Sequence, residues 1–417
     1  MTTSILRAEP NQRTGMNRPV RVLYSFPHKL GAERICKTAW HQVNGLAAAG
    51  ADVTVLTGSI CRSLPERVKV RTTLSWNPWK KLRIPYRLLG FLRACVLHDW
   101  LVARQLRALA DKIDLVHAWS PGARRTIVEA ARLGIVTVLE RPNAHTRFAY
   151  EVVQRECDRL GVTLPPNHDH AYNAEVLRVE EEEYRLADCL LCPSDFVVKT
   201  FLDQGFSMGK LARHIYGFNE KTYFPDPKPR DPQRGLTMLF AGVCAVRKGL
   251  HYALDAWLQS PARLDGTFLI AGEFLPAYAR ILSPLLAHPS VKVLGHRNDV
   301  PELMRTSDIM ILPSIEEGSA LVCGEAIGSG CVPLVSDASS GICGHMENAL
   351  VHRVGDVKTL AKQITLLHED RALLARLRAA GLRGAHEITW SAAGQKLLRV
   401  YQSVCAHRRE DRIGLPV

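Results

Sequence analysis

Two glutamates, eight positions apart, are the residues of this sequence best suited to chemistry. Glu317 follows an apolar run of strand length, Ile309–Leu312, and Glu325 lies in a short predicted helix that Gly328 ends. Eight helical steps separate two Cα atoms by ~12 Å, which exceeds the roughly 5–9.5 Å between the carboxyl groups of glycosidases. The spacing therefore favours two carboxylates that hold different parts of one long ligand. Two solvated surface glutamates are the alternative.

A basic pair supplies the second group of candidate residues. Arg247 and Lys248 precede Gly249, between a predicted strand over 237–243 and a helix that runs through Trp257. Backbone N–H groups point outward at a helix N-terminus, so cations placed there suit a diphosphate. A solvated basic helix start is the alternative interpretation.

Two further candidates follow predicted strands of the first half. His145 comes after the strand 135–140, and a polar histidine at the carboxyl end of a strand can act on a ligand. Gly31 lies in the loop after the strand 20–25, where it permits a tight turn before a helix. His117 lies in the middle of a strand and is interpreted as a structural core residue.

The elements that position these residues follow one scheme. A strand, a loop, a helix and a strand within about 30 residues form one βαβ unit, and ligands bind where strand C-ends meet helix N-ends. Asp188 and Asp308 each precede an apolar run that ends in Pro-Ser. This repetition predicts two similarly built doubly wound α/β domains whose strand ends face a shared cleft.

The spacing of Glu317 and Glu325, together with Lys248 before a glycine, closely resembles the signature of the retaining, nucleotide-sugar-dependent glycosyltransferases of family 4. The resemblance covers about residues 20–405 and is most specific over 237–341. It implies the GT-B fold, in which two Rossmann-like domains face each other across a cleft. It also implies transfer of a sugar from a nucleoside diphosphate, UDP or GDP, to an acceptor hydroxyl with retention at the anomeric carbon.

The resemblance implies a role for each candidate at the donor. Glu325 accepts hydrogen bonds from the ribose hydroxyls, Glu317 holds sugar hydroxyls near the reacting centre, and Lys248 binds the departing diphosphate. Backbone N–H groups around Ser319, Ala320 and Leu321 help Lys248 to stabilise the negative charge of the diphosphate. His145 contacts the sugar or the acceptor from the first domain when the cleft closes.

The sequence departs from the family pattern at one position. The family often has an arginine directly after the strand glycine, where this chain has Val243. Arg247 is expected to supply that charge from beside Lys248. The loop that contains Gly31 matches the family's glycine-containing loop, which faces donor and acceptor, only loosely.

Several other chemistries are disfavoured. Cys189 and Cys192 have the spacing of half a zinc site, but no second pair completes it, and no metal cluster is visible. Neither a GxGxxG after a strand nor a GxxxxGK[ST] occurs, which disfavours dinucleotide redox chemistry and phosphate-loop hydrolysis. A sugar-nucleotide epimerase or hydrolase of the same fold, and a non-catalytic membrane-binding or protein-binding member of the family, remain as alternatives.

Composition and length bound the architecture. The 417 residues, 47% hydrophobic and 23% charged, are typical of a two-domain globular protein. The start lacks the apolar core of a signal peptide and no run of 18 apolar residues occurs, so we expect a cytoplasmic protein, which can be peripheral on the inner face of the membrane. The eleven cysteines are expected to be buried free thiols. The expected boundaries are a tail 1–18, a first domain 19–223, a linker 224–235, a second domain 236–389 and a terminal helix 390–408 that returns to the first domain.

The net charge of +13 is concentrated in residues 62–107, which hold eleven Lys and Arg against Glu66 and Asp99. Within them, residues 77–90 interleave cations with Trp79 and leucines. This mixture fits an anionic membrane surface or an acidic glycan or lipid-linked acceptor. Nucleic acid is disfavoured because no recognition motif accompanies the charge, and a solvated basic face is the alternative. The acidic run 180–183 predicts the exposed face of a helix.

Overall fold

The computed structural model describes residues 18–76, 82–83, 89–228 and 234–413. Three predicted features lie partly outside them. These are the tail up to residue 17, residues 229–233 of the expected linker, and residues 77–81 and 84–88 of the basic segment.

The chain folds into two compact units. The first contains the chain up to Pro142, Asn173–Tyr216 and the chain from Trp390 onward, and the second contains Asn143–Tyr172 and Gly217–Thr389. The sequence predicts a first domain that includes residues 143–172, whereas in the structure these residues pack with the second unit.

Helix α5 (Thr146–Leu160) explains why residues 143–172 pack with the second unit. Its side chains Val153 and Cys157 are buried in the hydrophobic core of the second unit. Its Glu156 accepts a hydrogen bond from the Tyr252 hydroxyl at 2.6 Å and lies 2.8 Å from His251 Nε2. Apolar burial and a charge-assisted hydrogen bond thus hold α5 on this unit.

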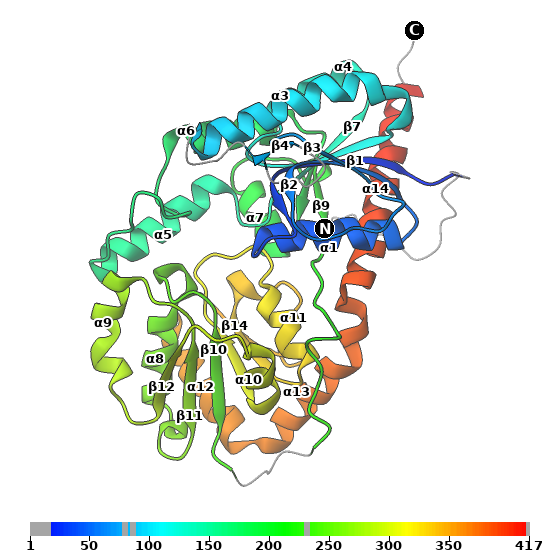
Figure 1. Cartoon of the computed structure of the whole chain (residues 1–417). Coiled ribbons are helices and arrows are strands. Elements are labelled where there is room, and N and C mark those ends of the chain that lie inside the picture. Colours follow the sequence, from blue (N-terminus) through cyan, green and yellow to red (C-terminus); the bar gives the residue numbers. More distant parts are fainter. Residues whose placement is uncertain (1–17, 77–81, 84–88, 229–233, 414–417) are drawn as a thin grey trace. The chain divides into compact units, whose positions relative to one another are not determined.

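The first unit is a seven-stranded parallel sheet in the order β3-β2-β1-β6-β7-β8-β9 (Figure 1). Its strands are β1 (Arg21–Leu30), β2 (Asp52–Ile60), β3 (Lys69–Thr72), β6 (Leu115–Trp119), β7 (Val136–Glu140), β8 (Cys189–Cys192) and β9 (Leu211–Arg213), with a small antiparallel pair β4 (Ser75–Trp76) and β5 (Leu82–Arg83). Its helices are α1 (Ile35–Ala48), α3 (Phe91–Leu109), α4 (Arg124–Arg132), α6 (Ala174–Leu186), α7 (Asp195–Leu202) and α14 (Trp390–Ile413).

The second unit is a six-stranded parallel sheet in the order β12-β11-β10-β13-β14-β15, with helices around it (Figure 1). Its strands are β10 (Thr237–Ala241), β11 (Thr267–Ala271), β12 (Val291–Gly295), β13 (Ile309–Leu312), β14 (Val332–Ser336) and β15 (Leu350–His352). Besides α5, its helices are α8 (Leu250–Gln259), α9 (Pro276–Leu286), α10 (Val300–Thr306), α11 (Leu321–Gly328), α12 (Val357–Glu369) and α13 (Arg371–Gly384).

The predicted doubly wound α/β class is confirmed, and so are the strand, helix and strand around Glu325, which are β13, α11 and β14. The short strands β3, β9 and β15 were not predicted. Each has only three or four residues, too few for a periodic pattern to distinguish a strand from a loop.

One aspartate device recurs in both sheets. In three places an aspartate just before a strand accepts a hydrogen bond from the N–H of the first or second residue of the neighbouring parallel strand. The pairs are Asp114 with Arg21 (3.0 Å), Asp188 with Thr137 (2.9 Å) and Asp308 with Thr237 (3.0 Å). The aspartates of the Asp-apolar-Pro-Ser repeat therefore fix the register between neighbouring strands and accept a hydrogen bond from a backbone N–H that would otherwise lack a partner.

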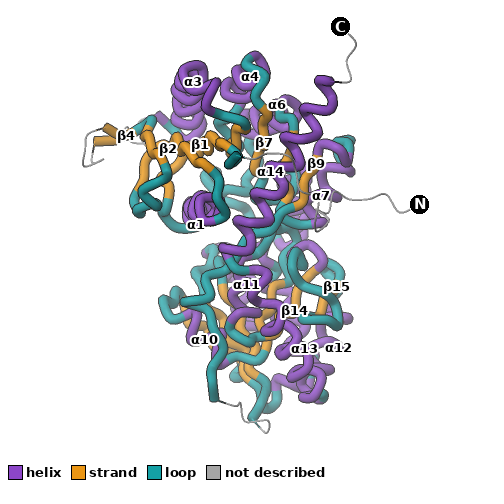
Figure 2. Tube along the Cα trace, turned by 90° about the vertical axis from the view of Figure 1, so that its right-hand side faces the viewer, coloured by secondary structure: helices purple, strands orange, loops and turns teal. Residues whose placement is uncertain are grey.

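Helix α14 completes the first unit. It packs beside α1, as Figure 2 shows, and Gly394 permits their close approach, because a Cβ there would lie 2.4 Å from the carbonyl carbon of Gly45. Leu397, Tyr401 and Cys405 are buried in the core of this unit. None of the helices among the described residues is both long and apolar enough to span a bilayer.

The acidic run 180–183 differs from its prediction as an exposed face. Glu183 is fully buried and accepts hydrogen bonds from the N–H groups of Gly122 (2.9 Å) and Ala123 (2.7 Å). Burial raises the pKa of Glu183 to about 7, although these hydrogen bonds favour the charged form. Nothing in a run of four glutamates distinguishes the one whose carboxylate stabilises the start of α4.

His117 lies in β6, is fully buried and forms a hydrogen bond with the Tyr401 hydroxyl of α14. Burial lowers its pKa to about 4, so the ring is neutral at pH 7. This environment fits the structural role expected from its mid-strand position.

Candidate active site

The candidate site lies in the second unit at the carboxyl ends of β10 and β13. A single 3₁₀ turn, Val246–Lys248, follows β10, and a loop of residues 313–320 joins β13 to α11. The Ile315 N–H donates to the Arg247 carbonyl at 2.9 Å and joins the two loops. Because these adjacent strands are parallel, their carboxyl ends meet at one edge of the sheet.

Gly249 allows this close contact. It has a φ of +67°, and a Cβ at this position would lie 2.0 Å from the Pro313 carbonyl oxygen. A side chain at residue 249 would therefore push the turn that carries Lys248 away from the loop that carries Glu317.

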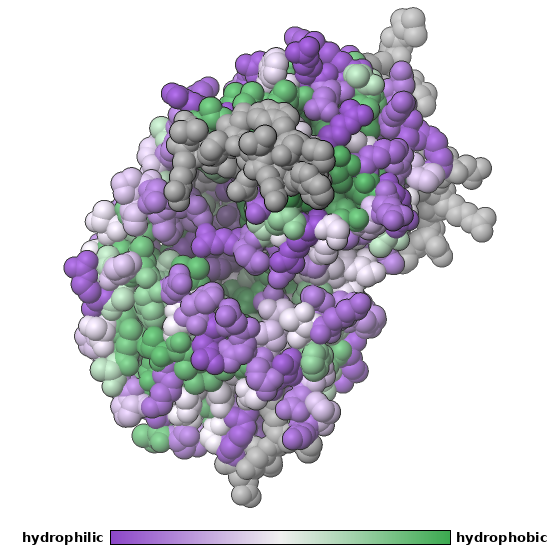
Figure 3. All heavy atoms as spheres, in the orientation of Figure 1, coloured by the Kyte–Doolittle hydropathy of each residue, from purple (hydrophilic) through white to green (hydrophobic). Residues whose placement is uncertain are grey.

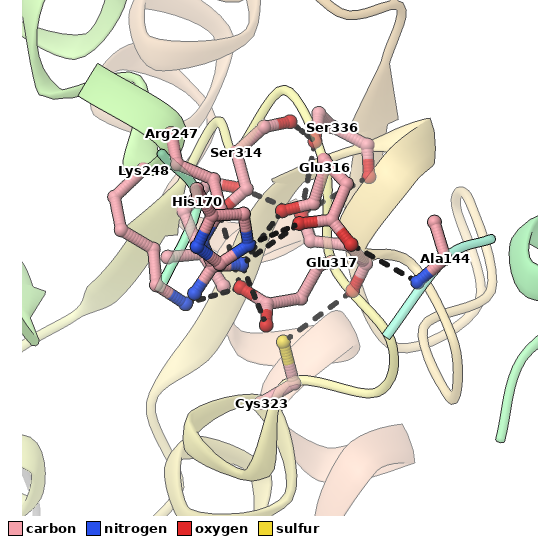
Figure 4. Close-up of polar contacts among 11 residues, drawn as sticks. Ala144, His170, Arg247, Lys248, Ser314, Glu316, Glu317, Cys323 and Ser336 are labelled. Atoms are coloured by element: carbon pink, nitrogen blue, oxygen red, sulfur yellow. Dashed lines mark hydrogen bonds and ion pairs between the residues drawn. The ribbon is translucent and has the colours of Figure 1, made fainter. Parts of the chain in front are cut away.

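Two cations and two carboxylates meet across the contact (Figure 4). The Arg247 Nη1 lies 3.2 Å from Glu317 Oε1 and donates to the Glu316 carbonyl at 2.8 Å. Lys248 forms an ion pair with Glu317 Oε2. All four side chains are at most 17% exposed, so their charges interact in a medium that screens them less than water does.

The pKa shifts follow from burial and from these pairs. Burial alone would raise the pKa of Glu317, but the charges of Arg247 and Lys248 outweigh it and hold the pKa below its ordinary value. Burial lowers the pKa of Lys248, and the charge of Arg247 acts in the same direction, against the Glu317 carboxylate. Glu317 is thus a carboxylate at neutral pH.

Glu316 is a functional candidate that the sequence did not predict. Its side chain is fully buried, and its Oε1 accepts a hydrogen bond from the Ala144 N–H at 3.0 Å. Its Oε2 lies 3.2 Å from His170 Nε2 and 3.4 Å from Arg247 Nη1 (Figure 4). Glu316 therefore orients Arg247 and fastens both ends of the segment 143–172. The sequence does contain a signal, because it has a pair of adjacent acids, Glu316 and Glu317, and a pair of adjacent bases, Arg247 and Lys248.

Hydrogen bonds hold the pKa of Glu316 well below its usual range. Burial is the largest single effect and favours the neutral form, but the bond with His170, the charge of Arg247 and the Ala144 N–H together outweigh it. Glu316 is therefore a permanent anion of the folded protein near neutral pH.

His145 lies beside this cluster. It is the N-cap of α5, is 1% exposed, and its Nδ1 accepts the Arg147 N–H at 3.3 Å. Its neighbour Ala144 donates to Glu316. The predicted boundaries put His145 in the first domain, whereas in the structure its segment belongs to the same unit as Lys248 and Glu317.

The remaining donor candidates of this unit lie on the loop and helix that follow β13. Ser319 is half-buried, Ala320 is the N-cap of α11 without a side-chain capping bond, and Leu321 is its first residue. Glu325 is half-buried on α11, where burial and then the Glu325 carboxylate, its hydrogen-bond partner, raise the pKa of Tyr223.

Buried serines support this loop from behind. The Ser336 hydroxyl donates to the Ser314 carbonyl at 2.6 Å, and the Ser339 hydroxyl donates to the Leu312 carbonyl at 2.8 Å. The Ser314 hydroxyl lies 3.4 Å from Glu317 Oε2. These bonds fix the backbone that presents Glu316 and Glu317.

Gly31 belongs to the other unit. It follows β1 with a φ of +84°, and its N–H donates to the Cys36 carbonyl at 3.0 Å. The structure thus gives it the turn-forming role, and its contact with a donor stays a prediction.

Among the described residues no three His, Cys, Asp or Glu side chains are grouped so that they could hold a metal ion. Cys189 and Cys192 are buried free thiols in β8.

Fold and site together define a class. Two parallel sheets, each in its own α/β unit, with a basic turn opposite an acidic loop at the strand ends of the second, are the architecture of GT-B proteins. Residues 37–213 match the family model described as Glycosyltransferase Family 4, and residues 235–370 match that of Glycosyl transferases group 1. The chain belongs to the family 4 glycosyltransferases.

Individual relatives are more distant. An N,N'-diacetylbacillosaminyl-diphospho-undecaprenol alpha-1,3-N-acetylgalactosaminyltransferase of Campylobacter jejuni is 33% identical over 125 residues, which are 28% of this chain and 31% of the relative. N-acetyl-alpha-D-glucosaminyl L-malate synthase of Bacillus anthracis is 27% identical over 163 residues, 38% of this chain and 42% of the relative. The chain therefore aligns with less than half the length of either curated relative.

A solved structure extends the likeness over the whole fold. Anabaena HepE in complex with UDP superposes with a TM-score of 0.64 at 17% identity, over 92% of this chain and 100% of that one. At this identity the likeness establishes the GT-B fold.

We predict that Gly249→Ala destabilises the protein by at least about 2 kcal/mol, because a left-handed conformation costs a residue with a Cβ about 1–2 kcal/mol and the clash with Pro313 adds to it. Urea unfolding measures the loss. Gly384→Ala is the control, since no atom lies within 4 Å of its Cβ position and its φ is −83°. Equal stability of the two variants would contradict the close contact.

We predict that Glu316→Ala lowers the free energy of unfolding by about 3–5 kcal/mol at pH 7, because Arg247 loses a buried partner. The folded pKa of Glu316 lies below its unfolded value of about 4.3. Its charged form therefore stabilises the protein above that pH, and this contribution is lost as the pH falls through the folded pKa.

The difference between wild type and Glu316→Ala should thus shrink as the pH falls from 5 to 3 in urea titrations. Exposed Glu369→Ala is the control and should stay within about 0.5 kcal/mol of wild type. A difference that is independent of pH would argue against ionised Glu316.

Proposed function

We propose that this protein is a retaining glycosyltransferase that moves a sugar from a nucleoside-diphosphate sugar to an acceptor hydroxyl. The observation that carries the proposal is the buried contact of Arg247 and Lys248 with Glu317, next to the start of α11. Membership of family 4 supports the proposal. Two cations near the carboxyl ends of neighbouring strands also suit a leaving diphosphate.

The cations are neutralised before any donor arrives. Arg247 and Lys248 carry two positive charges, and Glu316 and Glu317 carry two negative charges. A diphosphate would compete with Glu317 for Lys248, while Glu316 keeps Arg247 in place. We infer that this exchange frees the Glu317 carboxylate to accept hydrogen bonds from the sugar hydroxyls.

The other residues complete the proposed donor site. Glu325 would accept hydrogen bonds from the ribose, and His145 would contact the sugar or the acceptor. The N–H groups of Ser319, Ala320 and Leu321 would share the charge of the diphosphate with the positive end of α11. Because fixed cations and N–H groups stabilise the leaving group, the proposed reaction needs no metal ion.

The names of similar proteins guide the choice of substrates. The Campylobacter relative is named for a diphospho-undecaprenol-linked substrate, and HepE is solved with UDP and with UDP-glucose. We therefore propose a UDP-sugar before a GDP-sugar as donor, and a lipid-linked glycan as acceptor.

We expect Lys248→Ala to weaken binding of the matching nucleoside diphosphate about 10–100-fold, since a hydrogen bond to a charged group contributes about 1.5–3 kcal/mol. Isothermal titration and thermal shift with UDP, GDP, ADP and their sugar conjugates measure this. Lys362→Ala, an exposed lysine on α12, is the control. Wild type that responds to none of them at millimolar concentration would overturn the proposal.

We expect the Glu317→Ala variant to lose most sugar transfer but still to bind the nucleoside diphosphate, because the Glu317 carboxylate is assigned to the sugar. Turnover of the donor with and without acceptor also separates the alternatives. A sugar-nucleotide epimerase or hydrolase would consume donor without any acceptor, whereas a transferase requires one. Full transfer by Glu317→Ala would remove Glu317 from the site.

A further inference from the structure

A basic groove lies between α3 and α4 of the first unit, and none of the residues that line it is assigned to the donor. Its volume is about 650 Å³. Five of the residues that line it are arginines: Arg104, Arg107, Arg124, Arg125 and Arg132. The sequence predicts a basic surface within residues 62–107, and the fold adds the arginines of α4 to the part of it that lies on α3.

The positive charge of this face is only partly neutralised. Glu129 pairs with Arg107 at 2.9 Å and lies 3.9 Å from Arg132, while Arg124 pairs with Glu182 at 2.6 Å. Within the part of the chain that the structure describes, none of the ion pairs involves Arg93, Arg104 or Arg125. These three exposed guanidinium groups remain available to an anionic partner.

Exposed apolar side chains lie beside the arginines. Phe91, Val96 and Trp100 of α3 are 49%, 42% and 43% exposed. An adjoining hollow of about 450 Å³ is lined by Val96 and Trp100 together with Arg93, Arg125 and a single acid, Glu175. Figure 3 shows hydrophobic and hydrophilic surface interspersed along its upper edge, where Figure 1 labels α3 and α4.

The spacing along α3 places both kinds of side chain on one face. Arg93, Val96, Trp100, Arg104 and Arg107 recur every three or four residues, and each is exposed. The Arg104 guanidinium lies 5.7 Å from the centre of the Trp100 ring. A tryptophan flanked by arginines suits a boundary that is apolar on one side and anionic on the other.

We propose that the α3–α4 face, defined by Arg93, Arg104, Arg125 and Trp100 with their neighbours, docks on the surface of an anionic lipid bilayer. The arginines contact the phosphates of the headgroups, and Trp100, Val96 and Phe91 enter the interfacial layer. Charge complementarity selects this occupant, since the face is cationic and the headgroups are anionic. The proposal goes beyond sugar transfer and stands independently of the donor site.

Vesicle sedimentation of the full chain tests the proposal. Wild type should bind vesicles of phosphatidylglycerol and phosphatidylcholine at low salt, bind less at high salt, and ignore phosphatidylcholine alone. Arg93→Gln, Arg104→Gln and Arg125→Gln combined should lower the partition coefficient about 100-fold, because each cation near the surface contributes about fivefold. A triple change of Lys292, Arg353 and Lys362 to Gln, three exposed cations of the second unit, removes the same charge elsewhere and should have little effect.

Trp100→Ala separates insertion from charge. It should lower binding to anionic vesicles at both low and high salt, because its contribution is apolar. Wild type that does not bind anionic vesicles, or equal losses in the two triple variants, would overturn the proposal. Binding of soluble inorganic diphosphate at this face without binding of vesicles would identify a phosphorylated acceptor instead and would also overturn it. Nucleotide binding by the α3–α4 triple variant should equal wild type, so failure here is distinguishable from failure of the donor site.

Discussion

The donor site depends on the pairing of two buried cations with two buried carboxylates. Removing a charge from water costs several kcal/mol, so Arg247 and Lys248 can remain beneath the surface only if Glu316 and Glu317 reach them. That contact requires the turn after β10 to touch the loop after β13. The Ile315–Arg247 backbone bond and the absence of a side chain at Gly249 provide it.

This pairing also determines the resting state of the proposed enzyme. The cluster is neutral as a whole, yet its donors are held in place by the protein and need little reorganisation when a diphosphate arrives. Glu316 and Glu317 have different partners and therefore different roles. Glu316 is enclosed by Arg247, His170 and the Ala144 N–H, whereas Glu317 shares its carboxylate with Lys248 and lies beside the start of α11.

The units around the site are assembled by contacts that join distant parts of the chain. Aspartates before β6, β8 and β13 set the register of neighbouring parallel strands. Helix α5 and Glu316 hold residues 143–172 on the second unit, and α14 packs on α1 in the first. The same assembly brings α3 and α4 together, so that arginines 17 to 28 positions apart in the sequence line one groove.

The sequence by itself determined the elements and the chemistry of single residues. Apolar runs predicted β10, β13 and β14, and the spacing of Glu317 and Glu325 with Lys248 before a glycine indicated the family, because both are local patterns. Only the tertiary structure decided that Glu316 orients Arg247, that His145 joins the second unit and that Glu183 is buried against Gly122. These outcomes depend on which distant segments meet, and the periodicity of a segment describes its own exposed and buried faces but not the partner that covers them.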